Sequence, residues 1–133
     1  MKVVFDTNIL VSAMLWRGTP YRCLLAIRAG LAELILSPPI LEEFRAVLSN
    51  KFAMTKEAAE ENIAVVRESS VLIEIPGALH VIKDDPEDDK FVETALVAGA
   101  SWLVSGDKHL LRLGEYRGIK VISARTFLDM LAE

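Results

Sequence analysis

Short apolar runs alternate along the chain with longer stretches in which apolar residues recur every three or four positions. The runs lie at 3–5, 34–36, 71–73, 102–104 and 119–122. Runs of this length, bounded by polar and turn residues, are typical of strands buried in a parallel sheet. The stretches between them have the spacing of amphipathic helices, and Thr55 and Ser123 stand where two of these helices would be capped. The pattern predicts an α/β fold with a parallel sheet of five strands and helices on both faces.

Length and composition narrow the class of protein. With 133 residues, of which 52% are hydrophobic, the chain is expected to form one domain, residues 1–133, with a real core. No apolar run approaches the roughly 20 residues that span a bilayer, and the chain begins with a strand in place of a signal sequence. We therefore expect a cytoplasmic protein without a membrane partner. A net charge of −4 would argue against binding to nucleic acid, but a cation bound to a cluster of acids would cancel much of it. The net charge therefore does not exclude a nucleic-acid substrate.

Four carboxylates stand where the predicted elements would bring them together. Asp6 follows the first strand and Asp107 the fourth, so both emerge at one edge of the sheet if these strands are neighbours. Asp89 stands at the start of the helix before the fourth strand, whose first turn could overhang that edge. Glu43 lies on the apolar side of its helix, where an unpaired carboxylate is costly. The pattern predicts a pocket lined by oxygen atoms.

Such a pocket has a definite chemistry. Oxygen ligands suit a hard cation, Mg²⁺ or Mn²⁺, whereas zinc prefers the histidines and cysteines that this chain largely lacks. Without a cation the carboxylates would repel one another and raise each other's pKa values. Cations held in this way can activate water against a phosphodiester. The predicted reaction is hydrolysis of a phosphate ester.

Each acid also has a plain structural explanation. Asp6 and Asp89 could cap helices or complement their dipoles, and Asp107 could be a turn residue. Capping does not explain Glu43. The joint placement of the four acids, more than any one of them, favours the metal site.

Three segments carry a resemblance to a known family. They are FDTNILVSA at 5–13, SPPILEEFRAVL at 37–48 and DPEDDKFVETALVAGASWLVSGDKHLL at 85–111. With them the chain resembles the PIN-domain proteins, in particular the toxins of toxin–antitoxin pairs that are akin to VapC ribonucleases. The resemblance covers nearly the whole chain. It implies a three-layer α/β/α sandwich with a central parallel sheet.

The resemblance also implies a site and an activity. By this resemblance, four acids bind the metal and act in catalysis, and this quartet is Asp6, Glu43, Asp89 and Asp107. Two further residues would support the site through hydrogen bonds, and these are Asn8 and Ser105. Family members cleave RNA with Mg²⁺ or Mn²⁺, usually as homodimers, and the toxins are silenced by a small antitoxin protein. The implied function is that of a metal-dependent endoribonuclease.

Two positions in the quartet stay open. Glu42 adjoins Glu43, and the acidic run at 84–89 holds both Asp88 and Asp89. The helical face favours Glu43, but the residue pattern does not exclude Asp88, and the choice of Asp89 rests on the resemblance.

Other functions remain as alternatives. The first is a non-catalytic PIN fold that binds RNA or protein. A phosphatase of the haloacid dehalogenase type would need a second acid two residues after Asp6, where the chain has Asn8. A signalling receiver would need a phosphoacceptor after the third strand, and 75–77 offers none. A dinucleotide-binding fold would need a glycine-rich turn after the first strand, which is missing.

Overall fold

The computed structural model describes residues 1–83 and 85–133. Asp84, the first acid of the run at 84–89, lies outside the described residues. The elements follow one another in the order β1 (Lys2–Phe5), α1 (Thr7–Leu15), α2 (Thr19–Arg28), β2 (Glu33–Leu36), α3 (Pro38–Asn50), α4 (Lys56–Glu68), β3 (Ser70–Leu72), the 3₁₀ turn η1 (Pro86–Asp88), α5 (Asp89–Ala98), β4 (Trp102–Val104), α6 (Lys108–Leu113), β5 (Glu115–Tyr116), β6 (Ile119–Ile122) and α7 (Ala124–Leu131).

The sheet has the strand order β3-β2-β1-β4-β6-β5. All neighbouring pairs are parallel except β5 and β6, so the predicted parallel sheet is confirmed. The predicted number of five strands is wrong, because the described part of the chain forms six. The missed strand, β5, has only two residues and pairs with β6 across a turn at Arg117 and Gly118, both with positive φ. A strand this short has too few positions to show a period of two.

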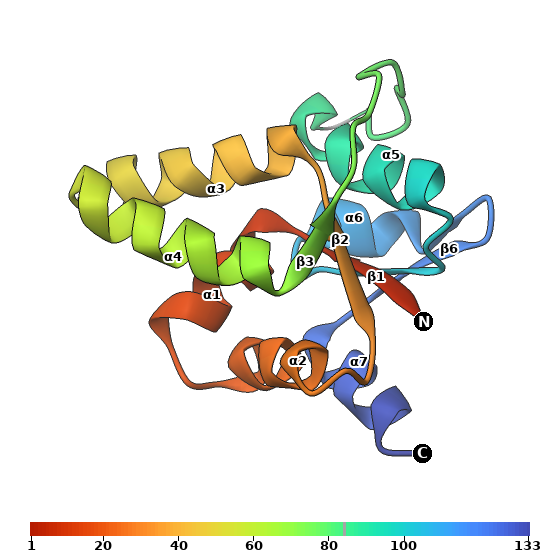
Figure 1. Ribbon diagram of the computed structural model, residues 1–133. Coiled ribbons are helices and arrows are strands. Elements are labelled where there is room, and N and C mark those ends of the chain that lie inside the picture. The colour runs from red at the N-terminus through yellow and green to blue at the C-terminus, as the bar shows by residue number, and fades with distance from the viewer. Residues whose placement is uncertain (84) are drawn as a thin grey trace.

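Helices cover both faces of this sheet (Figure 1). In this view α2 and α7 lie below the sheet and α5 lies above it, while α3 and α4 run side by side towards the left. The family-based expectation of a three-layer α/β/α sandwich is therefore confirmed. Within the described residues, no helix has both the length and the apolar character needed to cross a membrane.

The core forms where the sequence is most continuously apolar. Val3, Val4 and Phe5 of β1 have no exposed surface, because β1 is flanked by β2 and β4 and covered on both faces. The Phe5 ring meets the Phe127 ring of α7 edge to face, with 5.9 Å between the ring centroids. Packing on β1 thus anchors the strand from which Asp6 emerges.

The chain changes direction across the sheet at β1. From β1 it continues to β2 on one side and later returns to β4 on the other. Phe5 is the register partner of Val104, and the backbone N–H of Asp6 donates to the carbonyl oxygen of Val104 at 3.1 Å. The carboxyl ends of β1 and β4 therefore open side by side, at the kind of position where open α/β sheets form binding crevices.

Candidate functional site

Asp6 occupies the crevice between β1 and β4. It caps α1, with Oδ1 accepting from the Ile9 backbone N–H at 2.9 Å, and Oδ2 accepts from the Ser105 hydroxyl at 2.5 Å. Only 2% of Asp6 is exposed. Burial raises its pKa to about 6, and the negative charges of Asp107 and Glu43 add to this, against the lowering effect of the two hydrogen bonds.

Ser105 links the acids of the two strands. Its fully buried hydroxyl donates to Asp6 and accepts from the backbone N–H of Asp107 at 2.9 Å. Asp107 in turn caps α6, with Oδ1 accepting from the N–H groups of His109 and Leu110 at 2.8 and 3.3 Å. The same serine thus holds both acids, and Asp107 serves as a cap as well as facing the crevice.

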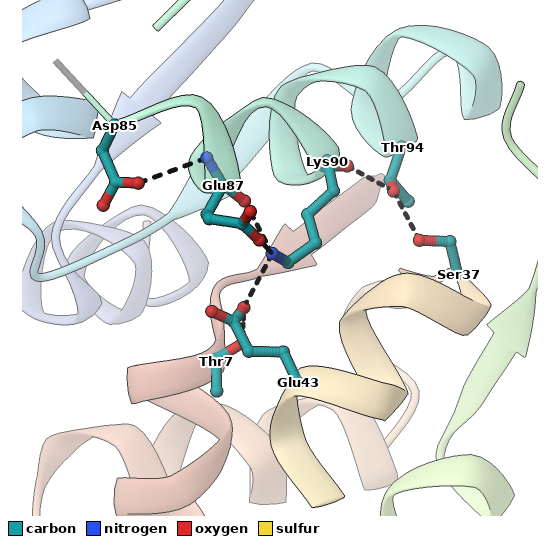
Figure 2. Close-up of polar contacts among 7 residues, drawn as sticks. All are labelled: Thr7, Ser37, Glu43, Asp85, Glu87, Lys90 and Thr94. Carbon is teal, nitrogen blue, oxygen red and sulfur yellow. Dashed lines mark hydrogen bonds and ion pairs between the residues drawn. The ribbon is translucent and has the colours of Figure 1, made fainter. Parts of the chain in front are cut away.

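Glu43 reaches this crevice from α3. Its side chain is about one-third exposed and lies on the inward side of the helix, where the sequence placed it. Thr7 donates to Oε2 of Glu43 at 2.6 Å, and the Lys90 ammonium lies 3.2 Å from the same oxygen. Figure 2 shows Thr7 and Lys90 approaching the Glu43 carboxylate from α1 and α5. Three elements therefore meet at this one carboxylate.

Asp88 is the fourth acid of the crevice. It ends η1 and precedes α5, and 8% of it is exposed. Its Oδ2 is buried and has no hydrogen-bond partner among the described residues. Burial raises the pKa of Asp88 to about 7, and neighbouring negative charges contribute in the order Asp107, Asp85, Glu43 and Asp6. A buried carboxylate oxygen without a donor is costly unless a ligand is expected there.

Asp89, which the sequence analysis placed in the quartet, is used differently. Its Oδ1 accepts from the backbone N–H groups of Val81 at 2.8 Å and of Ile82 at 2.7 Å. The carboxylate thus fastens the segment before η1 to the start of α5. The structure places Asp88, and not Asp89, in one cavity with Asp6, Glu43 and Asp107. Consecutive residues at a helix start point about 100° apart, and the sequence alone does not say which one faces the sheet.

Four of these acids line one small cavity of about 60 Å³. It is lined by Asp6, Thr7, Asn8, Glu43, Val47, Asp88, Phe91 and Asp107. Asn8 is exposed at its rim, and within residues 1–83 and 85–133 its side chain makes no hydrogen bond to an acid. Glu42 is exposed and does not line the cavity. The side chains that the sequence did not single out are Thr7 and Lys90, whose partner Glu43 lies far away along the chain.

The donor set fits a hard divalent cation in chemistry and charge, although the acids are not arranged around one. Across the described ranges, no group of three or more His, Cys, Asp or Glu side chains is already positioned to hold a metal ion. Most of the acids face protein donors: Asp6 faces Ser105, and Glu43 faces Thr7 and Lys90. The orphaned oxygen of Asp88 is the exception. Small rotations of these side chains would be needed to close them on Mg²⁺ or Mn²⁺.

The raised carboxyl pKa values predict how stability depends on pH without metal. The folded protein binds protons at Asp6 and Asp88 more tightly than the unfolded chain, so the stability that this proton binding contributes is fully present below about pH 4. It is lost as pH rises through about 6 and about 7. We expect the free energy of unfolding in EDTA to fall by on the order of a few kcal/mol between pH 5 and 8. Urea unfolding across this range measures it, and a steady rise in stability with pH would contradict it.

Comparison with known proteins assigns the chain to a family. The family model described as PIN domain matches residues 2–109, which is most of the chain. The chain belongs to the PIN domain family. The match spans α1, α3 and α5 and ends within α6, so all four crevice acids of this PIN domain lie inside it.

Solved structures share the fold of this PIN domain. One is VapBC2 from Rickettsia felis, bound to a DNA fragment from their promoter, with a TM-score of 0.67, 16% identity, and 92% of this chain and 98% of that chain covered. Another is PAE2754 from Pyrobaculum aerophilum, with a TM-score of 0.67, 19% identity, and 99% and 98% covered. At such identities the likeness extends to the fold alone. No curated protein matches the sequence.

Proposed function

We propose that this PIN domain is an endoribonuclease that depends on Mg²⁺ or Mn²⁺. In this proposal Asp6, Glu43, Asp88 and Asp107 hold the cation, and Asp88 takes the place first given to Asp89. The observation that carries it is the gathering of four carboxylates in one cavity at the carboxyl ends of β1 and β4. One of them has a buried oxygen to which none of the described residues donates. Repelling acids in a buried crevice favour a cation that neutralises them.

The surrounding residues have separate tasks in this site. Ser105 holds Asp6 and the backbone of Asp107 in a fixed relation, and Thr7 orients Glu43. When bound, the cation would supply an activated water and charge stabilisation at the phosphodiester. The exposed Asn8 at the rim lies where a substrate would enter, and its amide can donate or accept a hydrogen bond.

The substrate and partners are proposed from the family. RNA is proposed because the motifs of this chain resemble those of VapC ribonucleases. The Rickettsia felis structure with the same fold is a VapBC complex on promoter DNA. By that likeness we propose that this chain is the toxin of a toxin–antitoxin pair, that it forms a homodimer and that a small antitoxin binds it.

The first experiment compares the wild type with Asp6→Asn on a pool of single-stranded and hairpin RNAs, with Mn²⁺, Mg²⁺ or EDTA. We expect the wild type to cleave with metal and not in EDTA. Asp6→Asn should slow cleavage by at least about 100-fold, because it removes a negative ligand from the site. The metal-free variant should be as stable as the wild type or more so, since a repelling charge is gone.

Two results would change the assignment. Cleavage that persists in EDTA would refute the metal mechanism. Binding of RNA without cleavage, in every metal tested, would favour the non-catalytic PIN module.

A further inference from the structure

Lys90 borders the acidic crevice: it does not line the cavity of the four acids, but its ammonium reaches Glu43, which does. It stands in the first turn of α5, and its side chain is 12% exposed. The ammonium lies 3.2 Å from Oε2 of Glu43 and 3.6 Å from Oε2 of Glu87, and it donates to the Glu87 carbonyl oxygen at 2.6 Å. It also lies 5.3 Å from the centre of the Phe91 ring. A lysine this buried needs a negative partner, and Glu43 is the closest.

The position of this ammonium conflicts with the use of Glu43 as a metal ligand. Glu43 Oε2 already receives both the Thr7 hydroxyl and the Lys90 ammonium (Figure 2). A divalent cation at that oxygen would stand next to the positive charge of Lys90. The two cations repel, so the ammonium weakens the binding of a cation to this carboxylate.

The structure also gives Lys90 a second place to go. Glu87 is 84% exposed on its side chain and lies one helical turn before Lys90, with its carboxylate 3.6 Å from the ammonium. The flexible lysine stem allows the ammonium to move away from Glu43 while it keeps the Glu87 contacts. The exposed Glu87 carboxylate can then pair with the ammonium of Lys90 at a position that solvent reaches.

We propose that Lys90 is an internal counter-ion that occupies the cation's place at Glu43 in the metal-free protein and turns to Glu87 when the cation binds. This inference rests on the proposed metal site. It makes Lys90 a positioning residue with two opposed effects. It stabilises the metal-free crevice by neutralising one of its acids, and it weakens metal binding by competing for Glu43.

The test measures Mn²⁺ binding to the full chain by titration calorimetry, after removal of metal. Lys90→Met keeps an unbranched stem and removes the charge. We expect its dissociation constant for Mn²⁺ to fall by about tenfold, while its metal-free melting temperature falls by a few degrees. These opposite signs are diagnostic, because a merely structural role would weaken both folding and binding. Lys90→Gln repeats the measurement if the methionine variant does not fold.

Matched controls separate this effect from bulk charge. Lys120 also lies over an aromatic ring, 5.8 Å from the centre of Trp102. It pairs with Trp102 at the amino end of β4, whereas the crevice lies at the carboxyl end. Lys120→Met should leave the Mn²⁺ affinity within about twofold of the wild type, because Lys120 is exposed, does not line the cavity of the four acids, and its charge is screened by solvent and salt. Lys90→Arg keeps the charge and should bind as the wild type does. In a Glu43→Gln background, Lys90→Met should change the affinity little, because the competition is gone.

Each outcome decides between the two proposals. Tighter binding by Lys90→Met, or binding by that variant alone, supports the inference. Equal or weaker binding by Lys90→Met, beside clear binding by the wild type, overturns the role of Lys90 and leaves the metal site standing. If no variant binds Mn²⁺, the proposed metal site fails and the inference fails with it.

Discussion

Asp88→Asn is expected to abolish metal-dependent RNA cleavage, with a loss of at least about 100-fold, because the cation loses a negative ligand in a buried site. Asp88 is the acid whose Oδ2 is buried without a donor among the described residues. Its pKa is raised to about 7, chiefly by burial. Removing this charge relieves repulsion in the crevice, so the metal-free variant should be as stable as the wild type or more so. Initial cleavage rates in Mn²⁺ and urea unfolding in EDTA measure the two effects.

Asp89→Asn is the matched control for this variant. The asparagine carbonyl can still accept from Val81 and Ile82, so folding is retained, and no acid is removed from the crevice. Its cleavage rate should stay within about threefold of the wild type, since Asp89 supports the backbone near the crevice and is not one of the proposed metal ligands. The reverse pattern, with Asp89→Asn inactive and Asp88→Asn active, would return Asp89 to the quartet.

Asp89→Ala is expected to lower the free energy of unfolding by about 3 kcal/mol, because two N–H groups lose a charged acceptor. Asp89 is 6% exposed, and its carboxylate fastens the backbone of Val81 and Ile82 to the start of α5. For a domain of this size such a loss lowers the melting temperature by roughly 10 °C. Thermal and urea unfolding of the metal-free variant measure it.

The contrast with Asp88→Asn makes this result informative. Substitution of Asp88 should reduce cleavage without loss of stability, whereas substitution of Asp89 should chiefly reduce stability. An Asp89→Ala protein that unfolds like the wild type would show that the two backbone contacts contribute nothing to stability.

Much of the architecture followed from local patterns in the sequence. Apolar runs such as 3–5 predicted buried parallel strands, because both faces of such a strand must be apolar. Glu43 was singled out because an acid on an apolar helix side is costly, and the structure places it in the crevice. Asp6 and Asp107 followed from the rule that sites form at the carboxyl ends of strands. These are properties of single elements, so the sequence by itself contains them.

Only the tertiary structure decided how the elements meet. Which of Asp88 and Asp89 faces the crevice depends on the rotation of one helical turn against the sheet, and both registers agree with the sequence. The contacts of Thr7 and Lys90 with Glu43 join three elements, and no local pattern encodes such a meeting. The spacing of apolar residues can assign a residue to one face of a helix or strand, but the packing of the elements sets which faces are in contact. The sequence therefore determined the fold class and the acids that could bind a cation, and the packing decided which of them share one site.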